Sequence, residues 1–466
     1  MFKSSILCAS ILCASGMVMA ATTSPPGPPG ITPPGPPGPP PGPQPSITPG
    51  GPPGPIILPG PQALFCPKGR TWKQIGPAPL TVPGGTNSGE VLDIAIDPRG
   101  SNDSTIYVAT NGGIWKTIDG GATWDTRTDC LASVRMGAVA LDAGNPSVVY
   151  AGTGNLFSSG GVNLPISTIV YKSYDAGWSW WPLSLPSGSI YTIRMVSPAA
   201  KQLLVGTEKG LFRSTDGGEN FHSVLTGAIS DLKVDTANSL RIYAAVAQKG
   251  ILRSNDGGET FPTNLFNISP TGSTFPGASQ PGFILLSQST SPNNQTIYAS
   301  VELGGGYLGL YKSSTGGTSW SLLPQAAAAI MANGCNCFYT HTIGVDPKDA
   351  NRVYLGFTKL YGSPDGGQTW PLTGNNLHDD LHALVFSPPS HVSGSPTSPT
   401  PPIPFYLGTD GGIAKTSNGT NFTGINGTAP HGIASNLFGP PIDTGRGSAA
   451  GRSGRCTPVP VSCIPP

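Results

Sequence analysis

The chain has 466 residues, of which 65 are glycine, 52 are proline and only 11% are charged. Because an ordinary globular domain carries roughly 25% charged residues, turns rather than helices must dominate this chain. The 25 lysines and arginines nearly balance the 24 aspartates and glutamates, so no net field attracts nucleic acid or an anionic membrane, and we expect neither as a partner.

Residues 1–20 have the pattern of a secretory signal peptide. A lysine near the start is followed by an apolar stretch and then by the small residues Val18 and Ala20. The apolar stretch is shorter than the about 20 residues that a membrane span needs. We therefore expect cleavage near Ala20, a secreted or periplasmic protein, and no membrane span.

Residues 21–63 consist mainly of proline and glycine. The glycines Gly27, Gly30 and Gly35 break the strict every-third spacing that a collagen triple helix requires. This segment is predicted to be a disordered, semi-rigid polyproline II linker.

Six cysteines follow the signal peptide: Cys66, Cys130, Cys335, Cys337, Cys456 and Cys463. An exported protein can pair them as disulfides, but the sequence leaves the connectivity open. Cys335 and Cys337 have no second pair of metal ligands nearby, which favours a structural or disulfide role over a metal site.

One short pattern recurs between residues 64 and 428. It reads Ser or Thr, any residue, Asp, any residue, Gly, any two residues and an aromatic. The copies are TIDGGATW at 117–124, SYDAGWSW at 173–180, STDGGENF at 214–221, SNDGGETF at 254–261 and SPDGGQTW at 363–370. Two further copies are degenerate: SSTGGTSW at 313–320 has Thr315 in the Asp position, and TSNGTNF at 416–422 is one residue short with Asn418 there.

The copies lie about 40 to 60 residues apart, close to the length of a four-stranded propeller blade plus insertions. Short β-branched and aromatic runs before each copy predict three strands, A to C, so the pattern is the turn from C to the outer strand D. The sequence thus predicts an all-β fold, a β-propeller of about seven four-stranded blades closed into one ring over residues 64–428. WKQI at 72–75 resembles an outer strand that could complete the last sheet, and residues 429–466 read as an irregular tail or a truncated further blade.

Each conserved position of the pattern has a structural role. The aspartates can accept backbone N–H groups of their own turn, the glycine supplies a positive φ, and the aromatic packs between sheets. The aspartates are Asp119, Asp175, Asp216, Asp256 and Asp365, and the aromatics are Trp124, Trp180, Phe221, Phe261, Trp320 and Trp370. Identical groups repeated once per blade do not form the single asymmetric constellation that catalysis needs.

This pattern resembles the Asp box of the Asp-box (BNR) propeller superfamily over residues 72–427. That superfamily includes sialidases, xyloglucanase-type glycoside hydrolases, the sortilin propeller and photosystem II assembly-factor propellers. The resemblance implies the fold but no single activity, because the boxes of the enzymes lie on the face away from the active site.

In a meander blade the A–B and C–D turns share one face, the box face, and the B–C and D–A connections share the other, the loop face. Binding is expected on the loop face, where long connections rest on a rigid scaffold. The candidate binding residues there are Asn111, Glu208, Glu302, His378, Asp379 and Asp380.

The enzymatic alternative rests on one B–C turn. The resemblance to xyloglucanase-type enzymes implies a catalytic carboxylate in a T-D-x-G-G turn; the first blade reads TNGG with Asn111, but the last reads TDGG at 409–412. Asp410 is therefore the candidate catalytic residue. Hydrolysis needs a second carboxyl group about 5 to 10 Å away, for which Asp379, Asp380 and Glu302 are candidates. Turn chemistry favours instead an Asp410 that caps its own turn.

The segment HDDLH at 378–382 could suggest a metal cluster. Its surroundings are strand-like, which would place His378 and His382 about 13 Å apart, so a solvated loop is favoured and no metal or other cofactor is predicted. The sequence also lacks the Arg-Ile-Pro signature of sialidases. It predicts an exported, monomeric, non-catalytic binding or scaffold propeller that engages a protein or glycan, with a xyloglucanase-type hydrolase of β-glucan as the alternative.

Overall fold

The computed structural model describes residues 64–65, 80–82, 85–87, 89–99, 102–129, 131, 133–154, 168–185, 188–197, 201–266, 282–290, 295–303, 306–332, 337, 339–392 and 402–426. The chain divides into two units, Met1–Leu58 and Pro59–Pro466, and every described residue lies in the second. The predicted signal peptide, the linker, the WKQI segment and the tail at 429–466 lie outside the described residues. Cys337 is among the described residues and is disulfide-bonded. The other five cysteines of the predicted mature chain lie outside the described residues.

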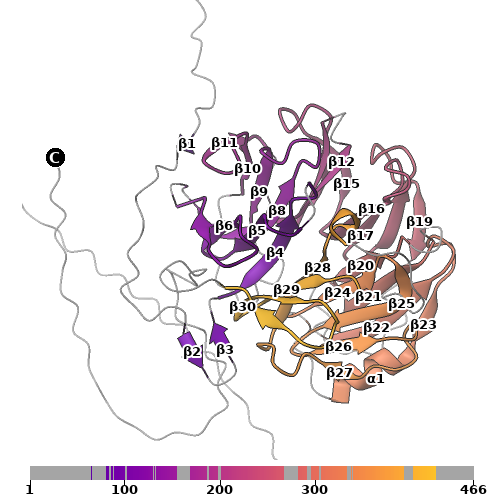
Figure 1. Cartoon of the computed structure of the whole chain (residues 1–466). Helices are drawn as coiled ribbons and strands as arrows, with labels where there is room; N and C mark the ends of the chain where they lie inside the picture. Colours follow the sequence, from indigo (N-terminus) through magenta and orange to yellow (C-terminus); the bar gives the residue numbers. More distant parts are fainter. Residues whose placement is uncertain are drawn as a thin grey trace, which may run out of the picture. The chain divides into compact units, whose positions relative to one another are not determined.

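Seven antiparallel sheets make up the propeller and confirm the predicted all-β fold with seven four-stranded blades (Figure 1). Blade 1 has β4 (Val91–Ile96), β5 (Ile106–Thr110), β6 (Gly113–Thr117) and β7 (Asp125–Thr126). Blade 2 has β8 (Met136–Leu141), β9 (Val149–Thr153), β10 (Val170–Ser173) and β11 (Ser179–Leu183). Blade 3 has β12 (Ile190–Ser197), β13 (Gln202–Thr207), β14 (Gly210–Ser214) and β15 (His222–Thr226).

The remaining blades repeat this order of strands. Blade 4 has β16 (Ile229–Val234), β17 (Ile242–Val246), β18 (Gly250–Ser254) and β19 (Thr263–Phe266). Blade 5 has β20 (Ile284–Gln288), β21 (Ile297–Leu303), β22 (Gly306–Ser313) and β23 (Ser321–Leu323). Blade 6 has β24 (Thr342–Asp346), β25 (Asp349–Gly356), β26 (Leu360–Ser363) and β27 (Leu372–Thr373). Blade 7 has β28 (Leu381–Phe386), β29 (Phe405–Thr409), β30 (Gly412–Thr416) and β31 (Thr423–Gly424).

The blades form one closed ring, as the sequence predicts. Each innermost strand contacts the next around the ring, and the last, β28, contacts the first, β4. Seven hydrophobic clusters fill the seven interfaces between neighbouring blades. Every interface therefore has its own apolar core, which is how a blade with two apolar faces becomes stable.

The Asp box is the turn between strands C and D in every blade. In the first box, Asp119 Oδ1 accepts the N–H of Thr123 at 2.9 Å, and Thr117 Oγ1 accepts the N–H of Gly121 at 2.9 Å. Gly120 and Gly121 have φ angles of 72° and 97°, which residues with a Cβ rarely adopt. The hydroxyl at the first box position thus ties the turn as firmly as the carboxylate.

The degenerate boxes keep the same turn with other acceptors. Thr315 Oγ1 accepts the N–H of Ser319 at 2.9 Å, and Asn418 Oδ1 accepts the N–H of Asn421 at 2.9 Å. A neutral oxygen therefore replaces the carboxylate without loss of the turn. In the second box, Ala176 occupies the first glycine position with a φ of 60°, a left-handed conformation that strains a residue with a Cβ.

The box aromatics extend between blades. Trp180 is fully buried and its Nε1 donates to Arg127 O of the preceding blade at 2.7 Å. Trp124 Nε1 donates to Ile425 O at 2.8 Å, which links the first blade to the last. Phe261 and Trp370 are buried as well, whereas Phe221 and Trp320 are only partly buried.

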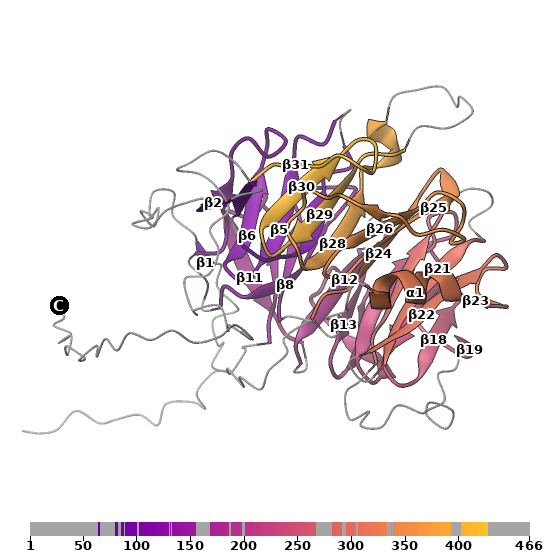
Figure 2. The ribbon, with the colours of Figure 1, turned by 90° about the horizontal axis from the view of Figure 1, so that it is seen from below.

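Four smaller groups of elements complete the described fold. The strand β1 (Leu64–Phe65) pairs with β11 as a fifth strand of blade 2, and β2 (Leu80–Val82) pairs with β3 (Gly85–Asn87). The helix α1 (Pro324–Ala332) lies beside β22 (Figure 2), and a 3-10 turn, η2 (Pro389–His391), follows β28. No helix within the described ranges is long and apolar enough to cross a membrane.

Candidate functional site

Among the described residues, three ionisable side chains of the loop face, those of Glu90, His382 and Asp410, come together where blade 7 meets blade 1. His382, on β28, is fully buried, and its Nε2 lies 2.7 Å from Asp410 Oδ1 and 3.7 Å from Glu90 Oε1. Glu90 directly precedes β4, and Asp410 sits in the B–C turn between β29 and β30. The side chains of His382, Glu90 and Asp410 are 0%, 9% and 28% exposed, so the imidazole lies buried next to two carboxylates.

Tyr339 and the backbone of Asp380 hold Asp410 in place. The Tyr339 hydroxyl donates to Asp410 Oδ1 at 3.0 Å and lies 3.2 Å from Oδ2, and its ring contacts the imidazole of His382 edge-on at 5.0 Å between centroids. Asp410 N–H donates to the carbonyl of Asp380 at 3.1 Å, and Asp380 adopts a φ of 64°. The carboxylate of Asp410 therefore already has protein donors on the side that faces His382.

Asn111 holds the other carboxylate. Its Nδ2 donates to Glu90 Oε2, and its Oδ1 accepts from Arg135 Nε at 3.0 Å. The Asn111 and Asp410 turns, TNGG and TDGG, are equivalent in blades 1 and 7, so neighbouring B–C turns contribute an amide and a carboxylate to one network. The two turns differ in sequence at this one position, Asn111 in blade 1 and Asp410 in blade 7, and the network differs in the same way.

Burial and charge set the protonation of this network. Burial opposes the imidazolium form of His382, but the hydrogen bond to Asp410 and the negative charge of Glu90 outweigh it and raise the pKa of His382. Burial, and then the charges of Glu90 and Asp410, raise the pKa of Tyr339, whose hydroxyl stays protonated and donates. Burial and repulsion by Asp410 raise the pKa of Asp380. The two carboxylates therefore favour the protonated form of His382.

The donor atoms of Glu90, His382 and Asp410 all lie within 4.8 Å of one another, which makes them the group among the described residues that could hold a metal ion. Two ligands of a tetrahedral ion with bonds near 2.1 Å lie about 3.4 Å apart. The 2.7 Å between His382 and Asp410 is shorter and is the length of a direct hydrogen bond. The spacing fits a shared proton better than a ligand shell.

The structure corrects two expectations for this region. The hydroxyl of Thr409, not Asp410, caps the TDGG turn: it accepts the N–H of Gly411 at 3.0 Å and donates to Gly412 O at 3.2 Å. Thr110 does the same in the first blade, which frees the next side chain from the turn. His382 does not lie in a solvated loop but is buried in β28.

The other predicted residues are distributed around the loop face. His378 packs against Gly411 beside Asp410, and Asp379 pairs with Lys359. Glu208 lies in blade 3 and pairs with Lys209 at 3.2 Å. Glu302, in blade 5, is buried and its Oε2 accepts the N–H of Phe283 at 3.1 Å, so it is not available at the surface. Two carboxylates lie near Asp410: Glu90, in the same network, and the predicted partner Asp380, whose charge is repelled by that of Asp410.

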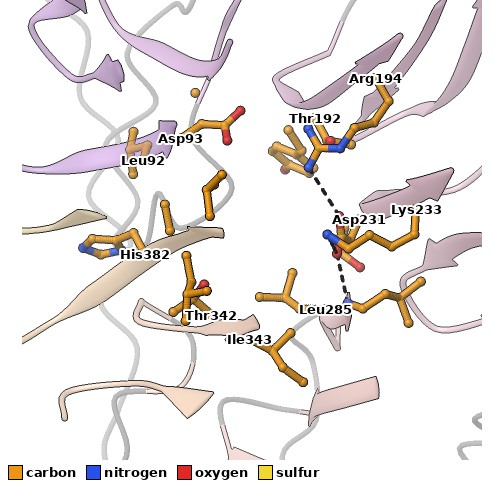
Figure 3. Close-up of a pocket in the computed structure, with 17 residues that line it drawn as sticks. Leu92, Asp93, Thr192, Arg194, Asp231, Lys233, Leu285, Thr342, Ile343 and His382 are labelled. Carbon is orange, nitrogen blue, oxygen red and sulfur yellow. Dashed lines mark hydrogen bonds and ion pairs between the residues drawn. The ribbon is translucent and has the colours of Figure 1, made fainter. Parts of the chain in front are cut away.

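A cavity of about 140 Å³ lies on the axis of the ring and is lined by all seven innermost strands. Figure 3 shows Asp93 and His382 on one side of it and Arg194, Asp231 and Lys233 on the other. Asp231 pairs with Lys233 at 3.3 Å and with Arg194 at 3.8 Å. Burial raises the pKa of Asp93, against the opposing charge of Arg194. The cavity has room for a few water molecules, at roughly 30 Å³ each.

Sequence reasoning missed Glu90 and Tyr339. Neither belongs to a repeat copy, and each lies in a connection that precedes an innermost strand, β4 or β24. The one signal that they share is this position shortly before the first residue of an innermost strand. A search of the D–A connections for carboxylates and phenols would have found both.

Comparison with known proteins finds similarity in sequence over part of the chain and similarity in fold over most of it. No protein-family model matches the chain. Over 164 residues it is 31% identical to a xyloglucanase of Hypocrea jecorina (strain QM6a), a match that covers 33% of this chain and 18% of that protein. An ancestral GH74 enzyme of known structure is 17% identical with a TM-score of 0.52, covering 73% of this chain and 47% of the enzyme.

YCF48, solved with a bound D1 peptide, is 16% identical with a TM-score of 0.47, covering 70% of this chain and 92% of that protein. The chain thus spans about half of the GH74 structure and less than a fifth of the xyloglucanase. At these identities the solved structures show a shared fold, and activity does not follow from it. The chain is a seven-bladed β-propeller with Asp-box turns, and it shares this fold with an ancestral GH74 enzyme.

Proposed function

We propose that the chain is an exported, non-catalytic binding propeller whose loop face engages a protein or glycan. The observation that carries this proposal is the engagement of Asp410 by His382 and Tyr339. A glycosidase needs two carboxyl groups on either side of a gap that admits the scissile bond. Here the buried imidazole of His382 occupies the space between Asp410 and Glu90. The two carboxylates serve the protein's own packing.

The charges of the loop face also support binding of a polar, uncharged surface. Lys209 pairs with Glu208, and Lys359 pairs with Asp379, with all four side chains between 37% and 64% exposed. Paired charges offer hydrogen-bond donors and acceptors without a net field, which suits hydroxyl groups or a peptide backbone. Exposed pairs of this kind contribute little to folding, so their exchange for a ligand costs little.

A xyloglucanase-type hydrolase is the second candidate. The 31% identity to a xyloglucanase over 164 residues favours it, together with the TDGG turn at 409–412. This activity would require one of Glu90 and Asp410 to act as the general acid and the other as the general base or nucleophile. His382 would first have to move out from between them. The burial of His382 on a central strand speaks against such a movement.

The test separates binding from turnover. Wild-type protein is screened against an array of β-glucans and a peptide library, and each hit is measured by calorimetry and by release of reducing ends. We expect a ligand that binds without turnover. Its binding should be about tenfold weaker in Glu208→Ala if it lies over blade 3, or in Lys359→Ala if it lies over blade 6. Glu259→Ala, on the box face, is the matched control and should bind normally. Release of reducing ends that Asp410→Asn abolishes would overturn the proposal in favour of the hydrolase.

A further inference from the structure

The seam between blade 7 and blade 1 is the place where the ring must close without a connecting segment. Among the described residues, the four strands of blade 1 and the four strands of blade 7 each follow one another in sequence, so neither sheet takes a strand from the other. The seam has an apolar core like the other interfaces, with Val91 of β4 packed against Gly408 of β29. In addition it carries two polar clusters, one on each face of the ring.

The first cluster is the Glu90–His382–Asp410 network on the loop face. His382 and Asp410 belong to blade 7, and Glu90 leads into the innermost strand of blade 1. A buried imidazolium 3.7 Å from Glu90 attracts blade 1 to blade 7 directly, because a low-dielectric site strengthens the attraction between charges.

The second cluster is centred on Asp103 on the box face. Asp103 lies in the A–B turn of blade 1, and its side chain is 5% exposed. It accepts from two groups of blade 7, Ser387 Oγ at 2.6 Å and Tyr406 Oη at 2.8 Å, and lies 2.8 Å from His391 Nδ1 of the same blade. Lys415 Nζ, on β30, lies 3.6 Å from Asp103 Oδ2, so one carboxylate of the first blade contacts four side chains of the last.

The other interfaces show what is special about this arrangement. The equivalent strand-B tyrosines donate to backbone carbonyls of the next blade, as in Tyr107 to Ala176 O at 3.2 Å and Tyr150 to Gly217 O at 3.1 Å. At the seam, Tyr406 meets a carboxylate instead. Charge-assisted hydrogen bonds are roughly twice as strong as neutral ones. The hydrogen bond from Tyr406 to Asp103 therefore holds the seam more strongly than a tyrosine–carbonyl contact would, and its additional strength comes from the charge of the carboxylate.

We propose that two polar clusters, Glu90–His382–Asp410 and the group around Asp103, close the ring, and that the proton on His382 makes the stability of this seam depend on pH. The charged and titratable groups that face His382 are Glu90 from blade 1, Asp410 and Asp380 from blade 7, and Tyr339 from the connection before β24. The pKa of folded His382 is raised, so its stabilisation is complete below the ordinary value of 6.5 and is lost as pH rises through the folded value.

The structure supplies a matched pair of probes for opening. Val91, the first residue of β4, and Ile229, the first residue of β16, are both fully buried, and each packs against a strand-B glycine of the preceding blade, Gly408 and Gly206. Val91→Cys reports on the seam and Ile229→Cys on the interface between blades 3 and 4. Labelling with a thiol reagent, followed peptide by peptide in the mass spectrometer, gives the two rates. Their ratio cancels the pH dependence of thiol reactivity itself.

Between about pH 6 and about pH 9 we expect the ratio of Val91→Cys to Ile229→Cys labelling to rise several-fold, because His382 loses its proton and with it the attraction to Glu90. In a His382→Gln background the ratio should already be high at about pH 6 and should stay constant as pH rises. If His382→Gln does not fold, Glu90→Gln takes its place and should give the same result. His222→Gln, an exposed histidine near Glu259, should leave the rise intact. A ratio that stays constant with pH, or that still rises in His382→Gln, would overturn the proposal.

Discussion

Replacement of Trp124 by alanine tests how the box aromatics hold the ring together. The side chain is 2% exposed, it belongs to the apolar cluster between blades 1 and 7, and its Nε1 donates to Ile425 O at 2.8 Å. A fully buried tryptophan changed to alanine typically costs about 3 to 5 kcal/mol, which includes the cavity left behind. Trp124→Phe removes mainly the hydrogen bond and should cost about 1 to 2 kcal/mol.

Calorimetry and urea unfolding measure both variants against the wild type. For a propeller of this size, Trp124→Ala should lower the melting temperature by roughly 5 °C. Trp178→Ala is the matched control, because Trp178 is only partly buried and its ring is stacked by the Arg127 guanidinium at 3.9 Å; it should cost about 1 kcal/mol or less. Equal destabilisation by Trp124→Ala and Trp178→Ala would refute the reasoning that the box tryptophan joins the blades.

Three further predictions concern the boxes. Ala176→Gly relieves a φ of 60° and should raise the free energy of unfolding by about 1 kcal/mol, measured in urea; a loss of stability would show that the turn is not strained. Asp216→Asn should cost about 1 kcal/mol, since the amide oxygen can still accept the Asn220 N–H, and calorimetry should show no calcium heat that the variant loses. Hydrogen bonds from Thr123 outweigh desolvation and lower the pKa of Asp119 to about 2 from 3.8, so its stabilisation is complete above about pH 4 and is lost as pH falls through about 2. The stability difference between wild type and Asp119→Asn should therefore shrink over that interval, and a constant difference would contradict the assignment.

The fold was predictable because its information is local. Each box encodes the same turn within seven or eight residues. Asp119 accepts a backbone N–H of the turn, and Gly120 adopts the positive φ that the turn requires. Seven such turns at blade-sized intervals leave little choice but a ring. Even the degenerate copies follow this logic, because Thr315 supplies the same acceptor as the aspartate it replaces.

The candidate site was predictable only in part. Asn111, Asp410 and Asp380 were identified from turn motifs and segment composition, and the structure brings them together. Glu90 was not, because its contact with His382 arises only when the two ends of the repeat array meet. Tyr339 was not, because it belongs to no repeat copy and meets Asp410 of the next blade. No local motif reports a juxtaposition between residues some 320 positions apart, such as Glu90 and Asp410. The TDGG motif also misled, since Thr409 does the turn capping and leaves Asp410 to the network.

Side-by-side measurement of stability and xyloglucan hydrolysis in wild type and Asp410→Asn tests most directly the claim that this carboxylate is structural. If Asp410 serves the His382 network, the variant should lose about 1 to 3 kcal/mol of unfolding free energy, the cost of weakening a charge-assisted hydrogen bond at a buried histidine. Wild-type protein should then release no more reducing ends than a heat-denatured sample. Wild-type turnover that disappears in an Asp410→Asn variant of unchanged stability would contradict the account.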